Sequence, residues 1–225
     1  MLNEKDTEFL KNTLPVWDKL DYDEQNLIVQ NTVPVIYQCG ENINSSAEDC
    51  VGVLLIKSGK IRVYILSEDG REITLYRLSH GDVCILSASC ILKNISFDVH
   101  INAESDTRVL LISSSFFKKL TQKNIYAENF SNKIAVDRFS DVMWTMEQIL
   151  FMSFDRRLAL FLIEESANQN SDTIHLTHEQ IAKYVGSARE VVSRMLKYFA
   201  GEGWVELTRG SVKILNKTAM QKLAS

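Results

Sequence analysis

The sequence has little of what marks membrane, secreted or disordered proteins. Its 225 residues include only nine Gly and two Pro, and no apolar run approaches the roughly 20 residues that a membrane span needs. The first residues, Met1–Asp6, lack the basic start and apolar stretch of a signal peptide. Its four Cys do not have the spacing of a disulfide framework. With 45% hydrophobic and 24% charged residues, the chain is expected to be a cytoplasmic protein of two domains with no membrane association.

Charge is distributed unevenly along the chain. Residues 1–153 carry 15 basic and 21 acidic side chains, whereas residues 154–225 carry 10 and 8. The bias is stronger near the end, where residues 177–225 hold 8 basic and 4 acidic side chains. This asymmetry indicates an anion-binding C-terminal part on an acidic body, although a charge difference of this size is also found on ordinary solvated surfaces.

The first hundred or so residues have mainly the pattern of short β-strands. Within 60–66, Ile61, Val63 and Ile65 alternate with more polar residues, as expected of a half-buried strand. The pair Asp69-Gly70 that follows is a strong hairpin signal. Further strands are expected over 51–56, 73–78, 99–103 and 108–112. Their close spacing predicts a compact antiparallel barrel or sandwich.

The spacing of the apolar residues changes after residue 124, and the stretch from there to residue 152 has neither Gly nor Pro. Apolar side chains there follow a heptad pattern: Ala135, Phe139, Val142, Met146 and Ile149. A parallel stripe widens the apolar face: Val136, Met143 and Leu150. The pattern predicts one long helix. Its apolar face either packs against its own barrel or, as its length favours, forms a dimer interface.

The stretch 176–215 carries the most information about function. Thr177-His178-Glu179-Gln180 fits the capping box that opens a helix, here one ending at Gly186. A second capping box is expected at Ser187, so two helices would be joined by a tight turn, as in a helix-turn-helix. Another amphipathic helix is expected over 156–167.

The second of these helices is predicted to have two different faces. Four apolar residues share helical spacing and are expected to point inward: Val192, Met195, Leu196 and Phe199. The opposite face holds Glu190, Ser193, Arg194 and Lys197. Arginine can bond to guanine and glutamate to the cytosine amino group in the major groove. A β-hairpin is then expected from 204 to 215, with Arg209 at its tip placed to contact a phosphate.

Barrel, long helix and winged helix-turn-helix occur in the order found in the Crp/Fnr family of transcription regulators, which the whole chain resembles. The resemblance is carried by Leu55–Val63, by Gly81-Asp82 and above all by Arg189–Arg194. It implies an α+β fold with a cyclic-nucleotide-binding-like jelly roll, and three parts: 1–122 for sensing, 123–153 for dimerisation and 154–225 for DNA binding. It also implies a dimer interface at these residues: Phe139, Val142, Met146 and Ile149.

The same resemblance implies a homodimer on a twofold-symmetric DNA operator with a G·C pair at the centre of each half-site. Glu190, Ser193 and Arg194 occupy the reading positions typical of the Fnr branch, whereas Arg189 is similar to the cAMP receptor protein. The bases at the ends of the half-site can therefore be of either the Fnr type or the cAMP-receptor type. Phosphate contacts are expected from Ser187, Lys197 and Arg209. The hairpin 68–71 corresponds to a loop that contacts RNA polymerase in the Fnr branch.

The resemblance places an effector pocket in the barrel, at residues Gly81, Asp82, Cys84, Leu86, Ser87 and Cys90. Cyclic-nucleotide binders need an arginine followed by Ser or Thr, but counting back from Ala103 finds Phe97 and Asp98 there. We therefore expect no cyclic-nucleotide binding. An Fnr-like iron–sulfur cluster is not expected either, because the first 38 residues contain no Cys.

The segment Cys84–Cys90 is similar to the haem-binding stretch of the CO-sensing branch, but Leu86 stands where the ligating His would be. His80 and His100 could supply a ligand instead, and packing of small buried cysteines is the simpler interpretation. A redox, metal or haem sensor thus remains an alternative, and the cofactor is left open.

Two further classes of protein have less support from the sequence. An enzyme is not expected, because the sequence shows no nucleophile–base pair, metal-spaced His/Glu set or Gly-rich phosphate loop. A ligand-binding module that acts through protein contacts would show no salt-dependent DNA affinity. The polar face of 189–197 argues against that module and favours a DNA-binding regulator controlled by an unidentified effector.

Overall fold

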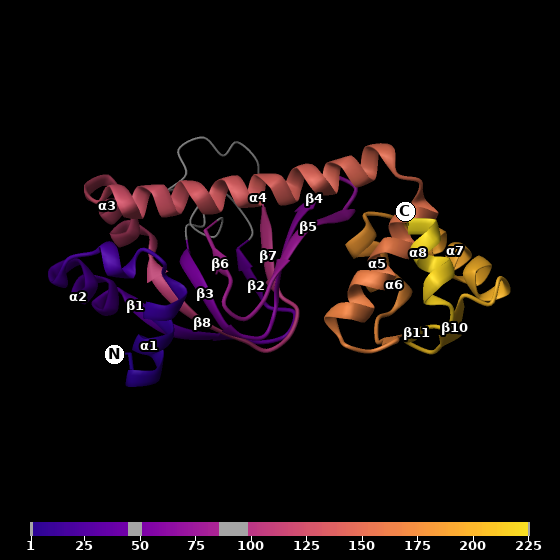
Figure 1. The fold of residues 1–225 in the computed structure, drawn as a ribbon, viewed down its shortest axis with the longest axis horizontal. Helices are drawn as coiled ribbons and strands as arrows, with labels where there is room; N and C mark the ends of the chain where they lie inside the picture. The colour runs from indigo at the N-terminus through magenta and orange to yellow at the C-terminus, as the bar shows by residue number, and fades with distance from the viewer. Residues whose placement is uncertain (1, 45–50, 86–98, 225) are drawn as a thin grey trace. The chain divides into compact units, whose positions relative to one another are not determined.

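The computed structural model describes residues 2–44, 51–85 and 99–224. Within these ranges the chain forms two compact units. One comprises residues up to 65 together with 75–142, and the other comprises 66–74 together with 143–225. Figure 1 shows the strands of the first unit and the C-terminal helices of the second. No helix in these ranges is long and apolar enough to cross a membrane.

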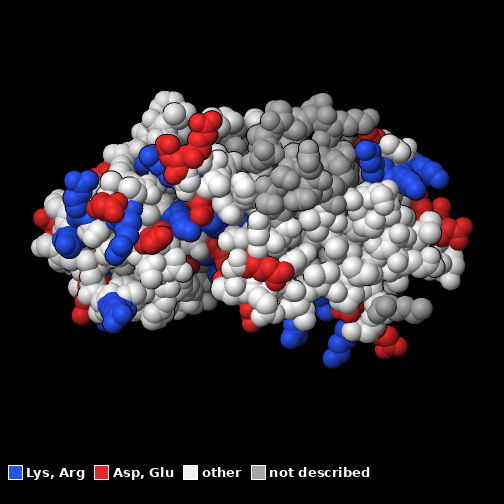
Figure 2. Space-filling model, turned by 180° about the vertical axis from the view of Figure 1, so that it is seen from behind, with Lys and Arg blue, Asp and Glu red and all other residues white. Residues whose placement is uncertain are grey.

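Acidic and basic side chains are intermingled on the face of the molecule shown in Figure 2. The excess of basic residues near the C-terminus is therefore not visible there as a uniformly basic surface.

The first unit contains two four-stranded sheets. The first has the order β1-β8-β3-β6, with bounds Thr32–Tyr37, Thr107–Ser113, Gly52–Ser58 and Val83–Cys84. The second has the order β2-β7-β4-β5, with bounds Asn42–Asn44, His100–Ala103, Ile61–Leu66 and Glu72–Leu78. Strand β8 pairs antiparallel with both β1 and β3, and β7 with β2 and β4. This two-sheet arrangement is that of an α+β fold with a jelly roll, and the sheets do not close into one barrel.

One core lies among residues contributed by both sheets. Leu54 and Ile56 of β3, and Ile61 and Val63 of β4, are fully buried in the same apolar cluster. The alternation in β4 predicted a polar exposed face, but Arg62 is also buried, with 4% of its surface exposed. Its guanidinium lies 4.1 Å from the ring centroid of Tyr64, so a stacked cation occupies the face that was expected to be solvated.

The N-terminal part of the chain is helical, and the expectation of mainly strands was wrong there. It forms α1 (Glu4–Thr13), a 3-10 turn η1 (Trp17–Lys19) and α2 (Tyr22–Gln30). Side-chain caps begin both α-helices: Asn3 accepts from Asp6 N at 2.8 Å, and Asp21 and Glu24 form a capping box. The signal was present in these short caps, but the helices are too short to show a clear period.

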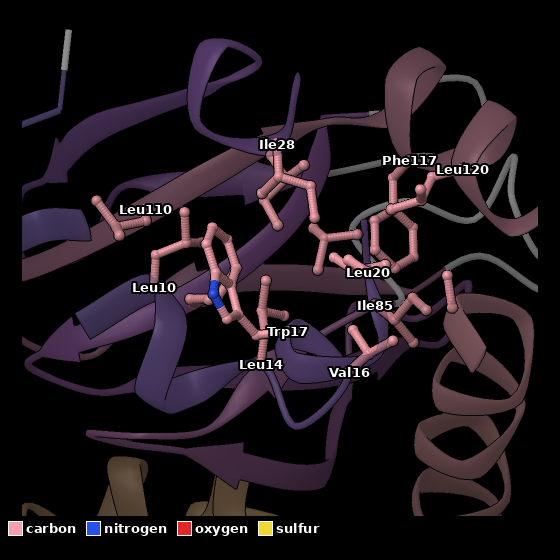
Figure 3. Packing of buried hydrophobic residues seen from close by; sticks show 14 of the residues in the cluster. Leu10, Leu14, Val16, Trp17, Leu20, Ile28, Ile85, Leu110, Phe117 and Leu120 are labelled. Carbon is pink, nitrogen blue, oxygen red and sulfur yellow. The ribbon is translucent and has the colours of Figure 1, made fainter. Parts of the chain in front are cut away.

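These helices add a second core beside the first sheet. Leu10, Trp17 and Ile28 from the N-terminal segment join Leu110 of β8 and Phe117 of α3 (Ser114–Lys123) in one buried cluster (Figure 3). Helix α4 (Ile125–Phe151) follows directly. Its bounds confirm the long helix expected between residues 124 and 152.

The second unit consists mainly of a small helical domain with a three-stranded sheet. Its helices are α5 (Phe154–Asn168), α6 (His178–Val185), α7 (Arg189–Gly201) and α8 (Lys217–Ala224). Its strands have the order β10-β11-β9, with bounds Val205–Thr208, Ser211–Ile214 and Thr173–Ile174. The core includes Leu158, Leu162, Ile181, Leu196 and Phe199, all fully buried. This core fixes α6 and α7 against α5.

Candidate nucleic-acid interface

The first helix of the expected helix-turn-helix begins with the predicted capping box. Gln180 N donates to Thr177 Oγ1 at 3.2 Å, and Thr177 N donates to Gln180 Oε1 at 2.8 Å. Gly186 ends the helix in the left-handed conformation, at φ +61°, where a side chain would be strained. Both ends of α6 are therefore confirmed as the sequence indicated.

The second helix begins one residue later than expected and without a side-chain cap. Ala188 is the N-cap residue of α7, and no side chain accepts a cap hydrogen bond there. The predicted capping box at Ser187 is wrong. Ser187 belongs to the turn instead, since its N–H donates to Ala182 O at 2.9 Å. The turn after a left-handed glycine thus displaces the expected cap.

Helix α7 has an inward apolar face and an outward polar face. Val192, Leu196 and Phe199 are fully buried, and Met195 is half-buried. On the other side Arg189, Glu190, Arg194 and Lys197 are exposed, and Ser193 is half-buried. Three buried anchors at helical spacing hold the backbone, so the exposed side chains are presented from one rigid surface.

The hairpin that follows places a further cation at a turn. Strands β10 and β11 pair antiparallel, with Thr208 opposite Ser211. Arg209 and Gly210 connect them, and both are exposed. The expected hairpin is confirmed, and it gains β9 as a third strand on the far side of β11. Arg209 is thus carried by an ordered two-residue turn.

His178 in the first turn of α6 lies near the polar face of α7, which the sequence did not indicate. Burial lowers the pKa of its imidazole, and the positive charges of Arg189 and Lys197 lower the pKa further. Two cations close to one imidazole mark a locally positive surface. Such a surface favours an anionic partner.

The long helix α4 exposes an apolar face. Phe139 is 64% exposed, Met146 46% and Ile149 36%, while Val142 is half-buried. The parallel stripe is also exposed: Val136, Met143 and Leu150. The side of α4 that carries Ala127, Ser131 and Ile134 is buried in the first unit. Phe139, Met146 and the residues of the parallel stripe are therefore exposed within the described chain, whereas Val142 packs against the core of the first unit. Exposed apolar side chains gathered along one helix are typical of an interface.

The residues expected around an effector pocket are only partly described. Gly81 is exposed in a turn, where the Asp82 carboxylate accepts from Ser79 N at 2.8 Å. Cys84 is buried in β6. Leu86, Ser87, Cys90, Phe97 and Asp98 lie outside the described residues.

Neither His considered as a ligand is free of contacts. His80 Nδ1 is 2.7 Å from Lys57 O, and His100 stacks on Tyr64 with 5.2 Å between centroids. In the part of the chain that the structure describes, no three His, Cys, Asp or Glu side chains come together as metal ligands would.

A helix-turn-helix with a β-hairpin wing, joined by a long helix to a two-sheet domain, defines a DNA-binding transcription regulator. Residues 156–223 match the model of the Crp-like helix-turn-helix domain, and residues 34–124 match that of the cyclic nucleotide-binding domain. A solved structure of a Crp/Fnr family transcriptional regulator from Eubacterium rectale is 44% identical, with a TM-score of 0.92, covering 95% of this chain and 99% of that one. The chain belongs to the Crp/Fnr family.

Curated relatives are more distant but cover most of both chains. The "Cyclic AMP receptor protein" of Thermus thermophilus is 23% identical over 93% of this chain and 96% of its own length. "Electron transport regulator A" of Shewanella oneidensis is 27% identical over 91% of this chain and 82% of its own length. The Eubacterium rectale relative is named a transcriptional regulator, and this protein is a DNA-binding transcription regulator of the Crp/Fnr type rather than an enzyme.

Proposed function

We propose that this regulator binds a twofold-symmetric operator as a homodimer and that α7 of each subunit reads one half-site in the major groove. The observation that carries the proposal is the outward face of α7, where Arg189, Glu190 and Arg194 are exposed above three buried anchors. These three residues contact bases, and Ser193 assists them. Recognition helices of such dimers enter successive major grooves about 34 Å apart.

The chemistry of these side chains suggests what they read. An arginine can donate two hydrogen bonds to guanine O6 and N7, and a carboxylate can accept from cytosine N4. Arg194 and Glu190 on one helix face can therefore address the two bases of a G·C pair. This agrees with a G·C pair at the centre of each half-site.

Contacts to the DNA backbone would come from three places around α7: Ser187 in the turn, Lys197 along the helix and Arg209 on the wing. The N-terminus of α7 has no side-chain cap, so its first N–H groups are available to a phosphate. Such contacts set the register of the protein on the duplex and make binding depend on salt.

Dimerisation would bury the exposed apolar face of α4. Phe139, Val142, Met146 and Ile149 recur at alternating steps of three and four residues, which is the repeat that lets two helices pack along a seam. A pair of such helices would also set the distance between the two copies of α7.

Control would come from an effector in the two-sheet domain. An effector that binds one dimer state better than another shifts the population between them. The exposed hairpin residues 68–71 are proposed as a contact for RNA polymerase. The protein would act in the cytoplasm, where its DNA lies.

Selection from a pool of random DNA duplexes tests the proposal. The full-length protein should enrich an inverted repeat whose half-site centres are one helical turn or a multiple apart, with a G·C pair in each half. Enrichment of an asymmetric site, or no enrichment over a pool carried through without protein, would contradict the proposal.

A further inference from the structure

Tyr76 of β5 holds a hydroxyl group whose hydrogen-bonding capacity is unused. Only 8% of the residue is exposed, and its Oη is buried with no hydrogen-bond partner in the described part of the chain. Burial raises the pKa of the phenol well above its usual range, and the nearby Cys84 and Asp141 raise it further, while Arg138 lowers it. The phenol is therefore neutral at physiological pH and has an O–H to donate.

A second unused donor lies beside it on α4. The guanidinium carbon of Arg138 is 5.0 Å from the ring centroid of Tyr76. Arg138 Nη1 donates to Asp141 Oδ2 at 2.7 Å. Its Nε, however, is buried without an acceptor among the described residues. Two elements far apart in the sequence thus bring together two donors that lack an acceptor.

The surroundings of this pair are apolar. Tyr76 belongs to the buried cluster that includes Leu75, Cys84 and Val109, and Val142 of α4 packs against that cluster. Leaving a polar group unbonded in such a place costs about as much as its desolvation, so nearly all buried polar groups in folded proteins have a partner. Where two adjacent donors lack an acceptor among the described residues, a bound ligand can supply one.

We propose that Tyr76 and Arg138 bind the carboxylate of a small organic acid with an apolar body. A carboxylate has two oxygens, so one can accept from the phenol while the other accepts from Arg138 Nε, and the bond to a guanidinium is strengthened by charge. The apolar part of the acid would lie against the neighbouring apolar side chains. This inference rests on the proposed effector control and names the chemical class of the effector.

The position of the two donors gives the acid a route to the rest of the protein. Tyr76 belongs to a sheet strand and Arg138 to the long helix that carries the exposed apolar face. A carboxylate that bonds to both favours the arrangement in which α4 lies closest to β5. An acid with higher affinity for that arrangement shifts the population toward it.

Titration calorimetry on the full-length protein without DNA tests the proposal, with benzoate and hexanoate as probes and benzamide as the neutral analogue of benzoate. At least one acid should bind with a millimolar or lower Kd, and benzamide should bind at least about tenfold more weakly, because it lacks the charge. Failure of both acids to bind, or equal binding of benzamide, would overturn the proposal. Tighter binding of cyclic AMP than of either acid would overturn it as well.

Variants locate the site. Tyr76→Phe and Arg138→Gln should each weaken acid binding about tenfold, and the exposed Tyr126→Phe of the same helix should not. Because the Tyr76 hydroxyl has no partner among the described residues, Tyr76→Phe should leave the urea midpoint unchanged or raise it. A lower midpoint, or unchanged acid affinity in Tyr76→Phe, would overturn the assignment.

Acid binding and operator binding are measured separately, so failure of one proposal can be distinguished from failure of the other. If no acid binds but the selected duplex still does, the effector class is wrong and the DNA-binding proposal stands. If the acid binds but no duplex is enriched, the acid site stands and the DNA-binding proposal is wrong.

Discussion

Arg157 of α5 donates from Nη1 to the carbonyl oxygen of Val185 at 3.0 Å. Val185 is the last residue of α6, so its carbonyl has no partner within the helix. Burial lowers the pKa of the Arg157 guanidinium, yet an arginine stays charged at any pH of interest. A cation at the C-terminal end of α6 also interacts favourably with the negative end of the helix dipole. Arg157 therefore fixes the helix just before the turn that leads to α7.

Arg157→Ala should destabilise the C-terminal unit by about 1–3 kcal/mol, because it removes a charged donor and leaves a helix-end carbonyl unpaired. Urea unfolding followed by circular dichroism measures this loss. The matched control is Lys217→Ala at the start of α8, an exposed cation. Equal loss in the two variants would show that the bond to Val185 adds nothing.

His178 gives the stability a dependence on pH. Its pKa is below the ordinary value of 6.5 in the folded protein, so the unfolded chain binds the proton more readily. The contribution of neutral His178 to the free energy of unfolding is complete above pH 6.5. It is lost as the pH falls from there through the lowered pKa. His178→Gln should flatten this part of the stability profile, and His175→Gln, at an exposed position, should not. Identical profiles for wild type and His178→Gln would contradict the assignment.

The exposed face of α4 predicts the oligomeric state. Phe139→Glu combined with Met146→Glu places like charges along the proposed seam, and the dimer should dissociate to monomers in sedimentation velocity. Asp137→Lys is the control, since this exposed residue lies on the opposite side of the helix at 100° per residue. A double variant that stays dimeric would exclude this face as the interface.

Much of the C-terminal unit was predictable because its signals are local. The Thr177–Gln180 capping box and Gly186 marked the two ends of α6. The apolar and polar faces of α7 followed from the helical spacing of its residues. The cap of α7 was not predictable in the same way, because the turn draws Ser187 N to Ala182 O. A capping motif therefore indicates a helix start only where the preceding turn leaves the residue free.

The first unit was predicted less completely. Strands β3, β4, β5, β7 and β8 were expected from short apolar or alternating runs, whereas the two-residue strand β6 was not. Helices α1 and α2 were missed because they are short, and their stability comes from packing on a sheet distant in sequence. Tyr76 and Arg138 could not be paired from sequence either. They are 62 positions apart, and only the contact between β5 and α4 brings them together.

Lys197 and Arg209 are expected to contact phosphates, and this can be separated from base reading. Lys197→Ala should weaken binding to operator and random duplex alike. Because a dimer has two copies, the slope of log K against log[salt] should become shallower by about 2. Fluorescence anisotropy at several salt concentrations gives the slope. Lys222→Ala on α8 is the control. An unchanged slope in Lys197→Ala would remove that residue from the interface.

Arg194 is the exposed arginine of α7 that is proposed to bond to guanine. The measurement is the affinity of wild type and Arg194→Ala for the selected operator and for a duplex of scrambled sequence, with the oligomeric state checked by sedimentation. If α7 reads bases, Arg194→Ala should lose about 1–3 kcal/mol per half-site on the operator, and its affinity there should come close to its affinity for the scrambled duplex. The dimer should stay intact. Unchanged affinity and unchanged preference for the operator would contradict base reading by α7.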